Sequence, residues 1–105
     1  MKQMYLTIAK KIKQEISREY SVCDMRVYGS CARNEDTEYS DVDVYVELDQ
    51  TNREVKKRIQ TIFWEQSLQY NRLITPLLLS KYEAEQSPLR SSPILCNIKS
   101  EGIII

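Results

Sequence analysis

The segment 41–48, Asp-Val-Asp-Val-Tyr-Val-Glu-Leu, restricts the possible folds of this chain more than any other. Polar or amphipathic side chains alternate along it with aliphatic ones, and a period of two places every second side chain on the same face of a β-strand. Its valines are β-branched, and β-branched residues favour strands. The segment therefore predicts a strand with one aliphatic face in a core, and with Asp41, Asp43 and Glu47 on the other face.

Further helices and strands are predicted on both sides of this segment from the spacing of apolar residues and from capping signals. They are a helix over 2–20, a strand over 22–28, a brief helical turn from Ser30, a helix from a capping box at 51–54 to about Gln69, a strand over 73–79 with Pro76 at an edge or bulge, a short helix from Ser80 to about Pro88, and a last helix from Ser91 to a C-cap at Gly102. This order predicts an α/β (α+β) fold, a small mixed β-sheet flanked by helices.

The length and composition fit one domain over residues 1–105. Lys plus Arg equals Asp plus Glu at 15 each, so the formal net charge is zero and no general nucleic-acid binding is expected. The N-terminal segment is too charged for a signal peptide, and no apolar run reaches membrane-spanning length. We therefore expect a cytoplasmic protein with no membrane association.

The chain contains no histidine, which excludes Ser-His-Asp and Cys-His catalysis and removes the most common transition-metal ligand. Its chemistry must rest on carboxylates, hydroxyls, Lys, Arg, or a hard cation bound through oxygen. Such a cation is expected at Asp41 and Asp43, because residues two apart on a strand lie roughly 6.6 Å apart and share a face. Adjacent carboxylates repel unless a cation neutralises them, and Mg²⁺ accepts one or two carboxylates together with phosphate oxygens. Taken alone, however, this pair also fits a solvated strand edge.

A Gly-Ser pair at Gly29 and Ser30 follows the strand predicted over 22–28. A glycine at such a turn lets the backbone come close to a ligand, and the free N–H groups of a helix start favour phosphate. Alone the pair is an ordinary turn. Together, Gly-Ser, ten residues and then Asp-x-Asp should arise by chance in on the order of one in a thousand chains of this length.

The segments Tyr-Gly-Ser-x-Ala-Arg at 28–33 and Ser-Asp-Val-Asp at 40–43 resemble the signature of the DNA polymerase β-type nucleotidyltransferase superfamily, in its minimal nucleotidyltransferase (MNT) branch. The order of helices and strands around them is also similar to that branch. The resemblance therefore implies the polymerase β-type nucleotidyltransferase fold and an enzyme that uses ATP or another nucleoside triphosphate.

The resemblance also implies a role for each residue of the motif. Gly29 and Ser30 would hold the β- and γ-phosphates, with Arg33 nearby as an electrostatic helper. Asp41 and Asp43 would be both catalytic residues and ligands of Mg²⁺, typically two ions, as an acceptor hydroxyl attacks the α-phosphorus and pyrophosphate leaves.

The sequence departs from the superfamily pattern at the third carboxylate that a later strand usually supplies. The strand over 73–79 contains no acid, and Thr75 stands at the expected place. Glu47 lies four residues from Asp43, roughly 13 Å along a strand, which is too far to share one ion. Asn34 stands where many relatives have glycine.

Minimal nucleotidyltransferases of this size resemble the antitoxin half of HEPN/MNT toxin–antitoxin pairs. The leading hypothesis is transfer of AMP from ATP to a hydroxyl, with a tyrosine of a HEPN toxin as acceptor. The alternative is a catalytically degenerate antitoxin that neutralises its partner by binding, and a third is a small-molecule-modifying transferase. The C-terminal isoleucines at 103–105 fit either a sheet edge or the surface of a homodimer or partner. No base-reading motif is visible.

Overall fold

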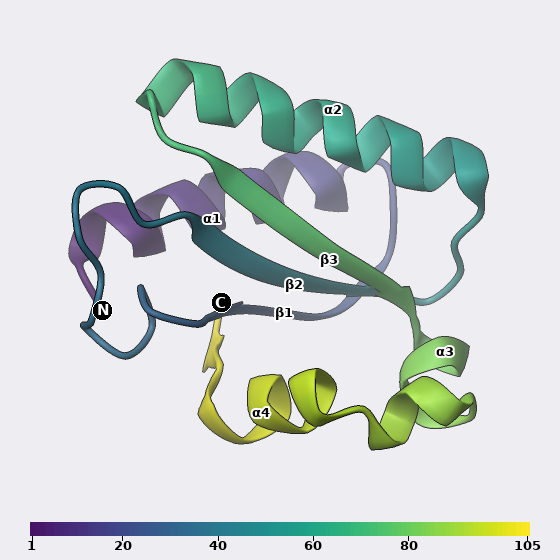
Figure 1. Ribbon diagram of the computed structural model, residues 1–105. Coiled ribbons are helices and arrows are strands. Elements are labelled where there is room, and N and C mark those ends of the chain that lie inside the picture. The colour runs from purple at the N-terminus through teal and green to yellow at the C-terminus, as the bar shows by residue number, and fades with distance from the viewer.

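The computed structural model describes residues 1–105, and its centre is a four-stranded mixed sheet in the order β3-β2-β1-β4 (Figure 1). β2 pairs in parallel with β3 and antiparallel with β1, and β1 pairs antiparallel with β4. The strands are β1 Val22–Tyr28, β2 Val42–Leu48, β3 Ile74–Ser80 and β4 Ile103–Ile104. The mixed α/β architecture predicted from the sequence is therefore confirmed.

Helices α1 (Gln3–Ser17) and α2 (Arg53–Tyr70) cover one face of this sheet (Figure 1). The main core of 16 buried residues lies between these two helices and the sheet. It includes the aliphatic face of β2, where Val42, Val44 and Val46 are fully buried as their alternation predicts. The opposite face of β2, which begins with Asp43, is therefore turned away from these two helices.

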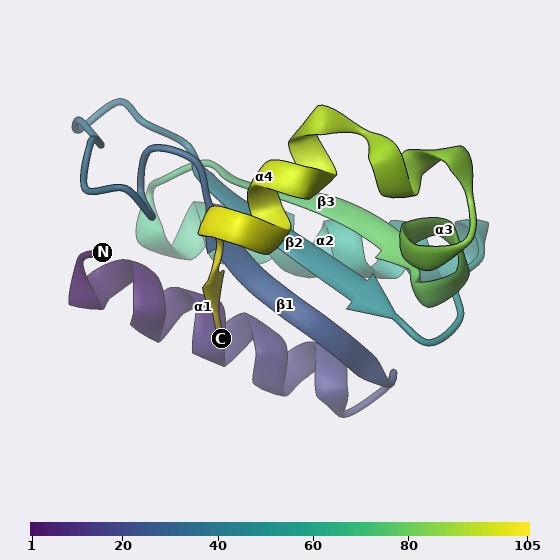
Figure 2. The same ribbon diagram turned by 90° about the horizontal axis from the view of Figure 1, so that it is seen from below.

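The opposite face is covered only in part, by α3 (Lys81–Glu85), the 3-10 helix η1 (Pro88–Ser91) and α4 (Pro93–Glu101) (Figure 2). A second cluster of five buried residues lies under them: Tyr45, Leu79, Ala84, Leu95 and Ile98. Tyr45 of β2 belongs to this second cluster, so the middle of the strand is buried on this face as well. Asp43, at the near end, is only partly buried.

The helix caps are as predicted in three of four places, among them the C-cap of α4 at Gly102. Ser80 forms a capping box with Glu83, and Ser92 caps α4 ahead of Pro93. The box predicted at 51–54 is wrong, because Asn52 is the N-cap of α2 and its side chain accepts from the Val55 N–H at 2.9 Å. An asparagine side chain is as good a cap as a threonine one, and here the helix begins one residue later.

The edges of the sheet agree with two sequence expectations. Pro76 lies in β3, an edge strand, where a residue without an N–H is tolerated. Ile103 and Ile104 form β4 on the other edge, beside β1, so these isoleucines finish the sheet. No helix of the structure combines the length and the apolar character that crossing a bilayer requires.

Candidate functional site

The Gly-Ser turn leaves the end of β1 with an unusual backbone. Gly29 has φ +75°, in the left-handed region that favours glycine. Two bonds close the turn, Arg33 N–H to the Gly29 carbonyl at 3.2 Å and Glu35 N–H to the Ser30 carbonyl at 2.9 Å. The brief helix predicted from Ser30 is wrong, because the residues form turns only, and Asn34 at φ +59° bends the chain away. Asparagine tolerates this conformation better than most residues other than glycine.

Asp43 lies between two neighbouring strands, opposite Tyr28 of β1 and Thr75 of β3. The Thr75 hydroxyl donates to Asp43 Oδ1 at 2.8 Å. The other carboxylate oxygen, Oδ2, lies so close to Gly29 that a Cβ added there would stand 2.7 Å from it. The Asp43 carboxylate therefore spans the gap between β3 and the Gly-Ser turn, and only glycine leaves room for it.

Asp41 lies one residue before β2 and is exposed. Its carbonyl accepts from the Cys31 Sγ at 3.3 Å, which connects the two parts of the motif through the backbone. Cys31 is fully buried, and burial raises the pKa of its thiol, so it acts as a core residue. None of the ion pairs in the protein involves Asp41 or Asp43. Neither carboxylate is thus paired with a cation from the chain itself.

Arg33 lies on the turn, where its Nε is 3.1 Å from Glu35 Oε2 in an exposed ion pair. Such a pair contributes little to stability and leaves the guanidinium free to exchange partners. Arg33 also lines a small hollow beside Gly29, about 110 Å³ in volume. The predicted phosphate-binding residues are thus on one turn.

The loop that joins the two parts of the motif is held by long-range contacts that the sequence did not reveal. The Arg72 guanidinium donates to the carbonyls of Thr37 at 2.6 Å and Ser40 at 3.1 Å. Asp36 accepts from the Tyr5 hydroxyl at 2.7 Å and pairs with Lys2 at 2.9 Å. These bonds, the one from Tyr5 above all, lower the pKa of Asp36 to about 2. The approach to Asp41 is therefore anchored to α1 and to the start of β3.

The side chains near Asp43 fit a cation completed by a ligand's own oxygens. No group of three or more acidic or thiol side chains gathers anywhere at metal-binding distance. Thr75, and not an acid, lies opposite Asp43 on β3, and Glu47 is bound by Lys99 at 3.0 Å and by the Tyr45 hydroxyl at 2.7 Å. Two carboxylates with phosphate oxygens suffice for Mg²⁺, which seldom has an all-protein cage.

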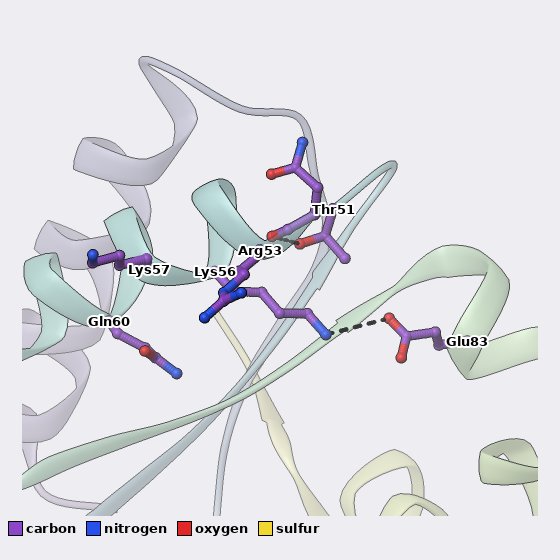
Figure 3. A pocket seen from close by; sticks show the side chains of 7 residues that line it. Thr51, Arg53, Lys56, Lys57, Gln60 and Glu83 are labelled. Atoms are coloured by element: carbon purple, nitrogen blue, oxygen red, sulfur yellow. Dashed lines mark hydrogen bonds and ion pairs between the residues drawn. The ribbon is translucent and has the colours of Figure 1, made fainter.

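The largest hollow of the protein lies elsewhere, at the opposite end of β2 (Figure 3). It measures about 630 Å³ and runs between the start of α2 and α3. Its lining is polar throughout and includes Lys56, whose ammonium is 3.8 Å from Glu83. Neither aspartate of the motif lines it, so size alone does not identify the candidate site.

An α/β domain in which a glycine turn lies against an aspartate without an ion-pair partner has the architecture of an enzyme that binds nucleotides. The chain belongs to the nucleotidyltransferase domain family, whose model matches residues 9–102.

Relatives of known sequence match less than half of this chain. Three proteins of Methanocaldococcus jannaschii, each named "Putative protein adenylyltransferase", are 42% identical over 40 residues, 43% over 44 and 42% over 45. The matches cover 38%, 42% and 43% of this chain. They span 41%, 45% and 45% of the relatives, which is less than half of each.

Solved structures show the same fold. A "putative nucleotidyltransferase" from Sulfolobus solfataricus superposes with a TM-score of 0.54 at 15% identity, over 96% of this chain and 78% of that chain. A chain of a toxin–antitoxin structure with AMP-PNP gives a TM-score of 0.60 at 15% identity, over 90% and 70%. At this identity the likeness concerns the fold alone.

Proposed function

We propose that residues 1–105 form a single domain that transfers AMP from ATP to a hydroxyl, with Mg²⁺, in the cytoplasm. One observation carries the proposal: the Asp43 carboxylate adjoins the Gly-Ser turn, and neither it nor Asp41 has a cation from the protein. A carboxylate so close to the proposed phosphate-binding turn favours a metal–triphosphate ligand.

Each residue of the motif has a distinct task in this proposal. The backbone at Gly29 and the hydroxyl of Ser30 hold the β- and γ-phosphates, and Arg33 turns from Glu35 to the phosphate charge. Asp41 and Asp43 hold the Mg²⁺, which supplies neutralisation of the charge that develops on the reacting phosphoryl group. The resemblance suggests two ions, and two carboxylates with three phosphates offer enough oxygens for them.

The proposed acceptor is a tyrosine hydroxyl on a HEPN toxin. The names of the three protein adenylyltransferase relatives and the toxin–antitoxin structure support a protein acceptor of this kind. The alternative is an antitoxin that neutralises its partner by contact. It is favoured by one observation, namely that Thr75 offers a hydroxyl where a third carboxylate would activate the acceptor.

The test uses ATP labelled at the α-phosphate, Mg²⁺ and the product of the neighbouring gene. Two proteins are expected to be active: the wild type and the matched control Asp49→Asn/Glu54→Gln, which removes two exposed acids outside the site. The inactive variant is Asp41→Asn/Asp43→Asn. We expect covalent label on the partner with the first two proteins only.

Label from the double aspartate variant at the wild-type rate would refute the proposed catalytic site. Tight binding and neutralisation of the partner with no label from any of the four nucleoside triphosphates would favour the contact-only alternative. Retention of neutralisation by Asp41→Asn/Asp43→Asn would support the same alternative.

A further inference from the structure

The small hollow beside Gly29 lies between the end of β1 and α4. Its apolar part is formed by Tyr28 and Ile94, with the fully buried Ile98 behind them. Its polar part includes the amide of Asn97 and the carboxylate of Glu101. Apolar walls with a few convergent polar groups are typical of small-ligand sites.

The residues that α4 contributes all lie on one face of that helix. Ile94, Asn97, Ile98 and Glu101 follow the spacing i, i+3, i+4 and i+7, which brings them together. In Figure 2, α4 lies across the sheet next to the loop that follows β1. The helix thus presents an amide and a carboxylate towards the Gly-Ser turn.

Ion pairs with two carboxylates of low exposure fix α4 in this position. Lys99 Nζ donates to Asp24 at 2.7 Å and to Glu47 at 3.0 Å, while its backbone carbonyl accepts from Arg26 at 2.9 Å. Ile98 is fully buried in the second core cluster. A ligand-reading helix that is held on both sides can discriminate better than a loop.

We propose that this hollow binds the adenine base of ATP, with Asn97 and Glu101 as the residues that read it. The inference rests on the proposed function, in which the phosphates occupy the adjoining turn. A carboxylate at Glu101 repels polyphosphate, so the phosphates stay at Gly29 and Ser30 and the hollow receives the uncharged part of the nucleotide. The Tyr28 ring provides an aromatic surface against which the base packs.

The chemistry of the two polar groups selects adenine. A carboxamide pairs with the N6 amino group and the N7 of adenine in a bidentate manner. A carboxylate accepts a bond from the same exocyclic amino group. Guanine and uracil present a carbonyl oxygen there, which the Glu101 carboxylate repels, and cytosine has an amino group but no N7. The expected order of affinity is ATP, then CTP, then GTP and UTP.

Binding of the four α,β-methylene triphosphates, measured by calorimetry with Mg²⁺, tests this inference without any transfer reaction. We expect the wild type to bind the adenosine analogue at least tenfold more tightly than the guanosine analogue. Asn97→Leu should weaken the adenosine analogue about tenfold, the value of one bidentate contact, and leave the guanosine analogue unchanged. Glu101→Gln should strengthen the guanosine analogue, since an amide can donate to its O6.

The control is Cys96→Ala, an exposed residue that does not line the hollow and should change no affinity. Unchanged thermal melting of Asn97→Leu and Glu101→Gln, both at exposed positions, excludes misfolding. Equal wild-type affinity for all four analogues, or an unaltered preference in both variants, would overturn the base assignment and leave the proposed function standing. Binding of none would overturn both.

Discussion

Gly29→Ala tests whether the turn and the strand aspartate really adjoin. The new Cβ would stand 2.7 Å from Asp43 Oδ2, on a backbone with φ +75°. A left-handed conformation costs an alanine roughly 1–2 kcal/mol. The carboxylate must also rotate away and lose the 2.8 Å bond from Thr75, at about 1 kcal/mol. The total is about 2–3 kcal/mol, a fall in melting temperature of roughly 10–20 °C for a domain of this size.

Urea unfolding of a double-mutant cycle separates the two contributions. In the Asp43→Ala background the nearest remaining atom is Asp43 Cβ, at an ordinary 3.8 Å, so only the backbone strain persists. Gly29→Ala should then cost about 1 kcal/mol less than in the wild type. Asn34→Ala, at an exposed position with φ +59°, serves as the control for backbone strain alone.

Additivity of Gly29→Ala and Asp43→Ala within about 0.5 kcal/mol would refute the reasoning. Such additivity would mean that the position of the Asp43 carboxylate does not depend on the absence of a side chain at residue 29. Gly29 would then be required only for the backbone conformation of the turn.

Three further predictions concern other contacts. Thr75→Val should reduce the rate of transfer about tenfold in steady-state kinetics, because valine has no hydroxyl to donate to Asp43. Thr75→Ser keeps a hydroxyl and should not reduce the rate. The lowered pKa of Asp36 stabilises the protein above the ordinary Asp pKa of about 3.9, and this stability is lost as pH falls towards the pKa of about 2. Tyr5→Phe removes the main cause, so urea midpoints should fall less steeply between those pH values. Lys99→Met should lower the free energy of unfolding by about 1–3 kcal/mol, since two low-exposure carboxylates lose their shared cation, itself 39% exposed.

Local patterns predicted most of the fold because they are set by residues close in the chain. The alternation at 42–48 follows from which side chains fit a half-buried strand, and the neighbouring strand and helices carry equally clear periods. The error at the start of α2 has the same origin. Thr51 and Asn52 are both good caps, and only the packed helix decides between them.

The sequence predicted the site residues but could not predict what surrounds them. That Thr75 lies opposite Asp43 depends on the parallel register of β3 against β2, which brings together residues far apart in the chain. Likewise, nothing near Arg72 indicates that it binds a loop more than thirty residues away. The shared hollow of Asn97, Glu101 and Gly29 was not predicted either, because it depends on where α4 packs. The catalytic roles of the motif residues stay predictions until the variants are assayed.

The outer face of β2 explains why one acid of this strand is available for chemistry and another is not. Asp43, Tyr45 and Glu47 follow one another on that face, so the geometry of the strand does not distinguish the two acids. The difference comes from the cation that α4 supplies. Lys99 of α4 and the Tyr45 hydroxyl of β2 itself bind Glu47, and this acid is buried. Asp43 receives only a hydroxyl from Thr75 and no cation, although α4 also lies beside the neighbouring Tyr28 and Gly29. Loss of the Lys99 ammonium should therefore release Glu47 without altering the bond between Thr75 and Asp43.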